Sequence, residues 1–182
     1  MKPSYRLTPI GMADFSDLDK VYFLDVETTG LNPEVSDILQ CAIIDGTGEV
    51  LLNKFYDSWL LSWPEAELVN GITKESVEGL PCFEQESGEV TRILADAKVI
   101  AGYNVRFDLS FLEAGGVAIP HRCQIVDVME DFSRSQQIYV LKRHSLRSAC
   151  RHINHELICA HDALDDSAAT LAVARHLRGA SE

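Results

Sequence analysis

The hydrophobic positions along the chain follow two periods, and each period predicts a different kind of element. Five apolar runs have the length of β-strands: residues 21–26, 38–45, 49–56, 99–103 and 124–129. The turn-forming sequence DGTG, residues 45–48, separates the second run from the third. We therefore expect the first three strands to form an antiparallel meander.

Segments with helical periodicity follow the first three strands and then alternate with the last two. They cover residues 64–69, 83–95, 104–114, 145–153 and 163–177. Asp162 is a suitable N-cap for the last of these helices. This order predicts an α/β fold with a central mixed five-stranded sheet, an antiparallel meander followed by parallel strands, flanked by helices.

Length and composition favour one soluble domain. The chain of 182 residues has no repeat or low-complexity linker, so we expect a single domain over residues 1–182, with an N-terminal extension at 1–20 and a core at 21–178. No segment resembles a signal peptide or approaches the ~18 apolar residues of a membrane span, which predicts a cytoplasmic protein without a membrane partner. The five cysteines form no CxxC pair and predict reduced thiols.

The net charge of −12 argues against a protein that coats nucleic acid through a basic surface. It does not exclude an enzyme that binds phosphates locally. A divalent metal ion held by carboxylates makes an acidic protein locally attractive to a phosphodiester.

Two carboxylates stand together in FLDVETTGL, residues 23–31. Asp25 and Glu27 project from one face of the predicted strand, whereas Leu24 and Val26 project from the other. Neighbouring acids raise each other's pKa unless a cation lies between them. A metal site is one interpretation; a strand end at which both acids face water is the other.

Further acids occur at the ends of other predicted elements. Asp108 lies one turn into a helix in GYNVRFDLSFL, and HDALDDSAAT contains His161 and Asp166. Each has an ordinary explanation by itself, as a first-turn acid or a structural histidine. Together, four carboxylates and one histidine suit hydrolysis of a phosphodiester with two Mg²⁺ or Mn²⁺ ions, because these ions prefer oxygen ligands. A histidine can accept a proton from water near neutral pH.

The same residues resemble a known family, the DEDDh 3′–5′ exonucleases, which include ribonuclease T and the proofreading epsilon subunit of bacterial DNA polymerase. FLDVETTGL, NVRFD and HDALDD are similar to its three motifs in order and context. VNGIT, residues 69–73, is similar to the family's HGIT segment, with Asn70 where histidine is common. HSLRSAC, residues 144–150, resembles the helix before the third motif. The resemblance extends from about residue 22 to residue 177.

This resemblance implies a ribonuclease H-like fold and removal of nucleotides from a 3′ end as nucleoside 5′-monophosphates. It implies that Asp25, Glu27 and Asp166 bind one metal ion and that Asp25 bridges to a second. It further implies that Asp108 acts through a metal-bound water and that His161 is the general base.

The resemblance also implies a substrate-binding turn. Backbone amides near Thr28 and Thr29 would hold the 3′ end, followed by Gly30, and Leu31 would wedge against the last base. Asn104, a plausible N-cap, and Phe107 are further candidates for substrate contact; Phe107 alternatively fills the core. Because the epsilon subunit continues into a polymerase-binding segment and nothing here follows Glu182, we expect an enzyme that acts alone or with an unseen partner, such as a polymerase or a second copy.

Alternative functions remain open at this point. The DVETTG form looks more like the proofreading branch than the DLEMTG form of oligoribonucleases, which favours single-stranded DNA ends over RNA ends. RNA trimming is the alternative, and a non-catalytic nucleic-acid-binding module of the same fold is another. A metal phosphohydrolase that uses His161 and Asp162 is a third.

Two other groups of side chains have both a structural and a functional interpretation. Arg143, Arg147 and Arg151 recur at four-residue spacing and predict a helical stripe, either a solvated face or a guide for an incoming single strand. Trp59 and Trp63 could stack on bases, but we expect them to pack against the protein.

Overall fold

The computed structural model describes residues 5–136 and 144–179 and contains one five-stranded mixed sheet in the order β3-β2-β1-β4-β5. The strands are β1 (Val21–Thr28), β2 (Ile38–Asp45), β3 (Val50–Phe55), β4 (Val99–Gly102) and β5 (Gln124–Asp127). β1 pairs antiparallel with β2, and β2 with β3, whereas β4 is parallel to both β1 and β5. The predicted meander followed by parallel strands is confirmed.

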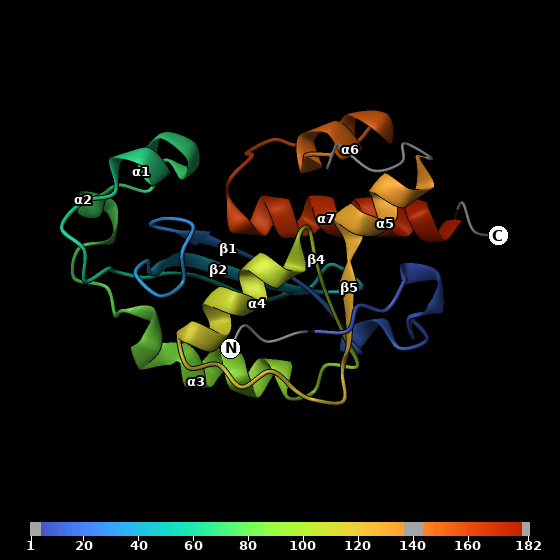
Figure 1. Cartoon of the computed structure of the whole chain (residues 1–182), viewed down its shortest axis with the longest axis horizontal. Coiled ribbons are helices and arrows are strands. Elements are labelled where there is room, and N and C mark those ends of the chain that lie inside the picture. The colour runs from blue at the N-terminus through green and yellow to red at the C-terminus, as the bar shows by residue number, and fades with distance from the viewer. Residues whose placement is uncertain (1–4, 137–143, 180–182) are drawn as a thin grey trace.

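Helices cover both faces of this sheet (Figure 1). One face carries α3 (Phe83–Leu94) and α4 (Val105–Ala114), and the other carries α5 (Val128–Ser135), α6 (Leu146–His152) and α7 (Ala163–Gly179). The short helices α1 (Pro64–Asn70) and α2 (Lys74–Val77) lie together at one end of the molecule. None of the helices in the described ranges is long and apolar enough to cross a membrane.

The alternation of side chains along β1 divides the core in two. Leu24 and Val26 pack in the cluster that contains residues of α3 and α4. Val21 and Phe23 pack on the opposite face, in the cluster that contains residues of α7. Because alternate side chains share a face, Asp25 and Glu27 project from the side of the sheet that α7 covers.

The structure corrects the predicted end of the last strand. We expected a strand as far as residue 129, but β5 ends at Asp127 and α5 begins at Val128. The Asp127 side chain accepts a hydrogen bond from the Glu130 N–H at 3.2 Å, so it caps the new helix. Helix α2 was also missed; Thr73 caps it by accepting from the Ser76 N–H at 3.2 Å.

The segment before β1 packs against the domain. It contains two short 3₁₀ helices, Ile10–Met12 and Leu18–Lys20. Ile10 and Phe15 are buried in the core cluster beside α7. The Thr8 N–H donates to the Ile125 carbonyl at 2.7 Å, which attaches the segment to the edge of β5.

Candidate active site

Asp25 and Glu27 lie near the end of β1 on the face covered by α7. Burial raises the pKa of Asp25 well above its usual range, and the negative charges of Asp108, Glu27 and Asp166 raise it further. Burial and the charge of Asp166 raise the pKa of Glu27 to about 8. The interpretation that both acids simply face water is wrong for Glu27, whose side chain is buried. These carboxylates share a concentrated negative field that a cation would relieve.

Asp108 reaches the same region from the first turn of α4. Its side chain is buried, and Oδ1 accepts a hydrogen bond from the Val26 N–H at 3.2 Å. Burial raises the pKa of Asp108, and this hydrogen bond opposes part of the increase. The bond fixes the start of α4 against β1, so the second predicted motif meets the first.

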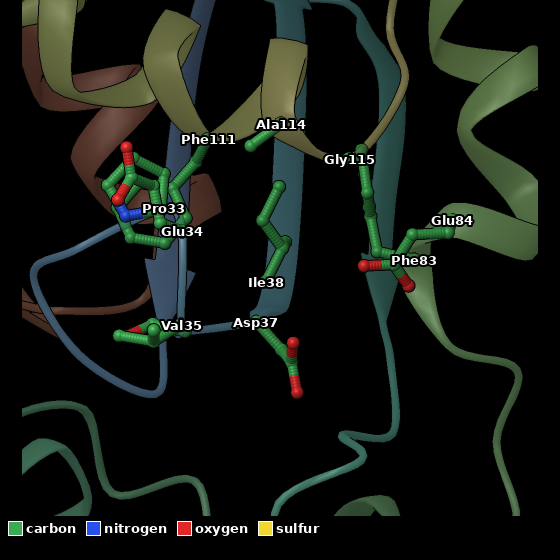
Figure 2. Close-up of a pocket in the computed structure, with 11 residues that line it drawn as sticks. Pro33, Glu34, Val35, Asp37, Ile38, Phe83, Glu84, Phe111, Ala114 and Gly115 are labelled. Atoms are coloured by element: carbon green, nitrogen blue, oxygen red, sulfur yellow. The ribbon is translucent and has the colours of Figure 1, made fainter.

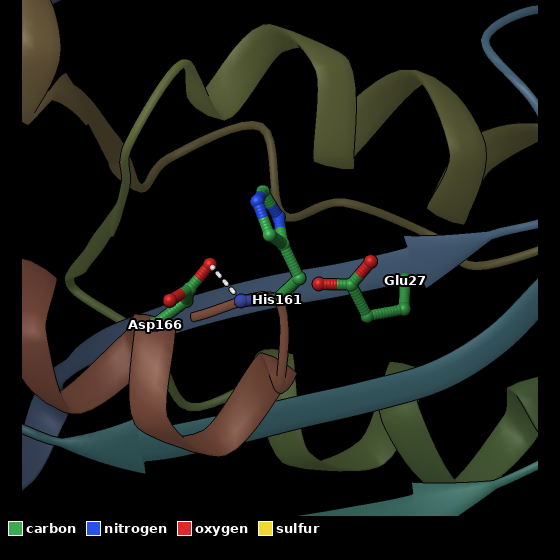
Figure 3. Close-up of side chains that lie close together, drawn as sticks. All are labelled: Glu27, His161 and Asp166. Carbon is green, nitrogen blue, oxygen red and sulfur yellow. Dashed lines mark hydrogen bonds between the residues drawn. The ribbon is translucent and has the colours of Figure 1, made fainter. Parts of the chain in front are cut away.

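His161 and Asp166 bring the third motif to Glu27. The ligand atoms of Glu27, His161 and Asp166 all lie within 4.8 Å of one another, and Figure 3 shows His161 between the two carboxylates. The His161 N–H donates to Asp166 Oδ2 at 3.3 Å, whereas Asp166 Oδ1 is buried without a hydrogen-bond partner among the described residues. Burial raises the pKa of Asp166 to about 6. An unsatisfied buried oxygen in a set of oxygen donors fits a divalent metal ion.

His161 has an exposed side chain and a strained backbone conformation. Its φ angle is 67°, in the left-handed region, and it directly precedes the N-cap of α7. Histidine adopts this conformation more readily than branched or bulky residues do, but it remains uncommon. The conformation turns the chain sharply into α7 and leaves the imidazole accessible at the edge of the acid cluster.

Asp162 caps α7, as predicted. Its Oδ1 accepts from the N–H groups of Leu164 and Asp165 at 3.0 and 3.2 Å. Its Oδ2 accepts from the Gln40 side chain at 3.1 Å. One carboxylate oxygen therefore caps the helix and the other is engaged by β2, which argues against the phosphohydrolase that would use Asp162 as a metal ligand.

In the turn after β1, Thr28 and Thr29 form hydrogen bonds within the protein, whereas Leu31 is exposed to solvent. Thr28 Oγ1 donates to the Gly30 carbonyl at 2.7 Å, and the Thr29 N–H donates to the Asp37 carbonyl at 2.9 Å. The Thr29 N–H is thus engaged within the protein, and binding of a 3′ end by this turn stays a prediction. Leu31 is 86% exposed, in keeping with the predicted wedge. The Asp37 side chain accepts a hydrogen bond from the Trp59 N–H at 3.1 Å.

Asn104 and Phe107 occupy the start of α4. Asn104 is at the N-cap position with φ 71°, but its side chain makes no capping hydrogen bond, and its N–H donates to Asp127 at 3.3 Å. Phe107 is partly buried, packs against the α3 and α4 core and contacts Phe111 at a ring distance of 4.8 Å. The core-filling interpretation of Phe107 therefore accounts for part of its surface.

Asn70 links α1 to this site. Its Nδ2 donates to the Thr28 carbonyl at 3.2 Å, and a hydrogen bond to Glu27 moderates the rise in the pKa of that acid. Trp63 is buried and donates to the Ile72 carbonyl at 2.7 Å, so packing is confirmed for it. The same prediction is wrong for Trp59, which is 71% exposed; its backbone N–H donates to the Asp37 carboxylate while its ring faces solvent.

Two of the three predicted arginines can be placed. Arg147 and Arg151 are exposed on α6, while Leu146 and Cys150 on the same helix are buried. Arg143 lies outside the described residues. The amphipathic helix is thus confirmed, and its basic face is open to solvent over the part that the structure describes.

A separate pocket of about 220 Å³ lies between residues 33–38, the start of α3 and the end of α4 (Figure 2). Glu34, Asp37 and Glu84 contribute carboxylates to it, and Phe83 and Phe111 contribute apolar surface. None of the predicted site residues lines it. The carboxylate cluster and this pocket are therefore distinct features of the molecule.

The raised acid pKa values predict how the stability of the metal-free protein depends on pH. Glu27 and Asp166 keep protons in the folded state at pH values where the unfolded chain has lost them. Their contribution to stability is complete below about pH 4 and is lost as the pH rises through about 6 and then 8. We expect the melting temperature in EDTA to fall from pH 5.5 to 8. The variant Glu27→Gln/Asp166→Asn should flatten this slope; a wild-type melting temperature that rises over this interval would contradict the assignment.

Comparison with known proteins identifies the family of this chain. Residues 22–174 match the RNase T family model, described as exonuclease. The chain is 30% identical over 156 residues to a PolC-type DNA polymerase III of Halalkalibacterium halodurans, and 26% identical over 156 residues to that of Thermotoga maritima. These matches cover 80% and 82% of this chain but only 10% and 11% of the polymerases, so the chain spans about a tenth of their length.

Solved structures define the class of fold. E. coli exonuclease I in complex with a dT13 oligonucleotide matches with a TM-score of 0.68 at 20% identity, over 87% of this chain and 40% of that one. Exonuclease X in complex with 5′ overhanging duplex DNA matches with a TM-score of 0.63 at 16% identity, over 88% and 92% of the two chains. The domain has the ribonuclease H-like fold of these exonucleases. The family match over most of its length shows that the chain belongs to the RNase T exonuclease family.

Proposed function

We propose that this protein is a DEDDh-type 3′–5′ exonuclease that hydrolyses single-stranded 3′ ends, with DNA favoured over RNA. The observation that carries the proposal is the convergence of Glu27, His161 and Asp166 within 4.8 Å, beside the partly buried Asp25 and the buried Asp108. Three separate chain segments supply these groups. A fold without a cation would gain nothing from gathering them, because unpaired buried carboxylates destabilise it.

The donor set suits divalent ions that prefer oxygen. Asp25, Glu27 and Asp166 would hold one Mg²⁺ or Mn²⁺, Asp25 would also bind a second, and Asp108 would assist through a water. Such ions lower the pKa of water and neutralise charge on the phosphate. The raised pKa values of these acids support this use, since a nearby positive charge would lower them and favour the ionised carboxylates that bind metal.

His161 would act as the general base. It is exposed and adjoins two of the acids, Glu27 and Asp166. An imidazole at this place can take the proton of an attacking water and hold it while the phosphodiester bond breaks. The Asp166 carboxylate accepts the backbone N–H of His161 and thereby fixes the backbone at this position.

The 3′-terminal nucleotide would lie over the turn 28–31. The exposed Leu31 offers an apolar surface to the last base, and Gly30 keeps the turn close to Ser36: a Cβ at Gly30 would approach Ser36 Oγ to 2.7 Å. The likeness to exonuclease structures solved with oligonucleotides supports a nucleic-acid substrate. The polymerase relatives support a polymerase as the partner of the domain.

Digestion of 5′-labelled DNA and RNA oligomers tests this function. With Mg²⁺ or Mn²⁺ we expect a ladder of products shortened from the 3′ end, faster for DNA, and no products in EDTA. Asp108→Asn can keep the hydrogen bond from the Val26 N–H, yet should reduce kcat by about 100-fold or more because it removes a charge at the site.

Asp131→Asn is the matched control for Asp108→Asn. Asp131 is also a buried acid with a raised pKa, but it lies on α5, where it accepts the Ile10 N–H at 2.8 Å and pairs with Arg134. We expect its kcat to stay within about threefold of wild type. Intact 3′ ends after long incubation with either metal would refute the enzymatic function.

A further inference from the structure

Gln40 is a buried amide within an otherwise apolar run of β2. It is 1% exposed and lies directly opposite Glu27 in the pairing of β1 with β2. Residues opposite each other in an antiparallel pair project from the same face, so Gln40 shares the side of the sheet that carries Asp25, Glu27 and α7. A buried amide is costly unless its donors and acceptor are satisfied.

The hydrogen bonds of Gln40 join the sheet to the start of α7. Nε2 donates to Asp162 Oδ2 at 3.1 Å and to Asn53 Oδ1 at 3.0 Å. Oε1 accepts from the Ala163 N–H at 3.1 Å. Because Oε1 faces a backbone donor and Nε2 faces two acceptors, only this orientation of the amide satisfies all three contacts.

We propose that Gln40 is a positioning residue that holds the segment 161–166 over β1, so that His161 and Asp166 face Glu27. The inference rests on the proposed exonuclease function of the carboxylate cluster. Asp162 and Ala163, two of the three residues that Gln40 binds, lie between His161 and Asp166 in the chain. Movement of this segment away from β2 would break both hydrogen bonds.

Apolar packing holds most of α7 in place, so we expect Gln40 to affect the position of the start of the helix and not whether the helix forms. Further along α7, Ala169, Val173 and Leu177 are buried in the core beside β1 and β4. These contacts hold the body of α7 against the sheet without Gln40. The first turn carries the acids Asp165 and Asp166 beside the apolar Ala163 and Leu164. Gln40 ties the start of the helix to the sheet through two hydrogen bonds, to Asp162 and Ala163.

Gln40→Leu tests this role because it keeps the volume of the side chain and removes its three hydrogen bonds. We expect kcat to fall by about 10- to 100-fold and Mn²⁺ affinity to weaken by about tenfold, as for other residues that orient metal ligands. The KM for a single-stranded oligomer should change by less than about threefold, because the substrate-binding turn is untouched. Hydrogen exchange should accelerate at residues 161–166 and remain unchanged in β1.

Asn53→Ala is the matched control. It removes the third partner of Gln40 but leaves the contacts with Asp162 and Ala163 intact. We expect its kcat and Mn²⁺ affinity to remain within about threefold of wild type. A loss as large as that of Gln40→Leu would overturn the proposal, because it would show that the effect does not pass through α7.

Asp162→Ser approaches the same link from the other side and also serves if Gln40→Leu does not fold. Serine still caps α7 but no longer offers the oxygen that Gln40 binds. We expect weaker Mn²⁺ binding and a lower kcat, and in the double variant a loss smaller than the product of the two single losses. Wild-type Mn²⁺ affinity and exchange in either folded variant would overturn the proposal. If the wild-type protein degraded no oligomer, the proposed function would fail, whereas exchange and Mn²⁺ binding would still decide the role of Gln40.

Discussion

Asp25→Asn should abolish exonuclease activity while making the metal-free protein more stable. The substitution keeps the size of the side chain and removes one of the negative charges that burial and Asp108, Glu27 and Asp166 oppose. We expect kcat to fall by more than about 100-fold, because substitution of residues that merely orient metal ligands already costs 10- to 100-fold. The melting temperature in EDTA should rise by a few degrees, since relief of 1 kcal/mol is worth about 2–4 °C in a domain of this size.

Asp45→Asn is the control for the predicted loss of activity and gain of stability in Asp25→Asn. Asp45 is also a buried acid of the sheet, at the end of β2, but hydrogen bonds from residues 47–49 outweigh its burial and lower its pKa. Its Oδ1 accepts from the N–H and hydroxyl of Thr47 and from the N–H groups of Gly48 and Glu49. Asp45→Asn should therefore lower the melting temperature and leave kcat unchanged. Stabilisation by Mn²⁺ should be lost in Asp25→Asn and kept in Asp45→Asn; equal responses would contradict the assignment of Asp25.

His161→Asn should reduce kcat by about 10²- to 10⁴-fold, the usual contribution of a general base. Asparagine is suitable because it tolerates the left-handed conformation at φ 67°, whereas alanine would add backbone strain to the loss of the imidazole. The melting temperature should change little, since the His161 side chain is exposed. Measured kcat and KM for a labelled single-stranded oligomer, with Mn²⁺ saturating, separate the loss of the base from a loss of binding.

His155→Ala provides the control in the same connection between α6 and α7. His155 is exposed, and its backbone N–H, which the substitution retains, donates to the Cys150 carbonyl at 2.9 Å. We expect unchanged kcat for this variant. An active His161→Asn enzyme, or an inactive His155→Ala enzyme, would show that the base lies elsewhere.

The sequence by itself determined the sheet and the identity of the acidic motifs. Strand alternation in FLDVETTGL placed Asp25 and Glu27 on one face, and the structure confirms this through the opposite burial of Leu24 and Phe23. The N-cap Asp162 was also predictable, because capping is a local interaction between a side chain and the next turn of its own helix. Such features depend on neighbours within a few residues.

Only the tertiary structure decided how the motifs meet. The contact of Asp108 with the Val26 N–H joins residues that are 82 positions apart, and that of Gln40 with Asp162 joins residues 122 positions apart. Neither strand period nor helix period specifies such partners, because they arise from the packing of α4 and α7 on opposite faces of one sheet. The polar Gln40 inside an apolar strand was a visible signal, but its meaning required the helix that lies above it.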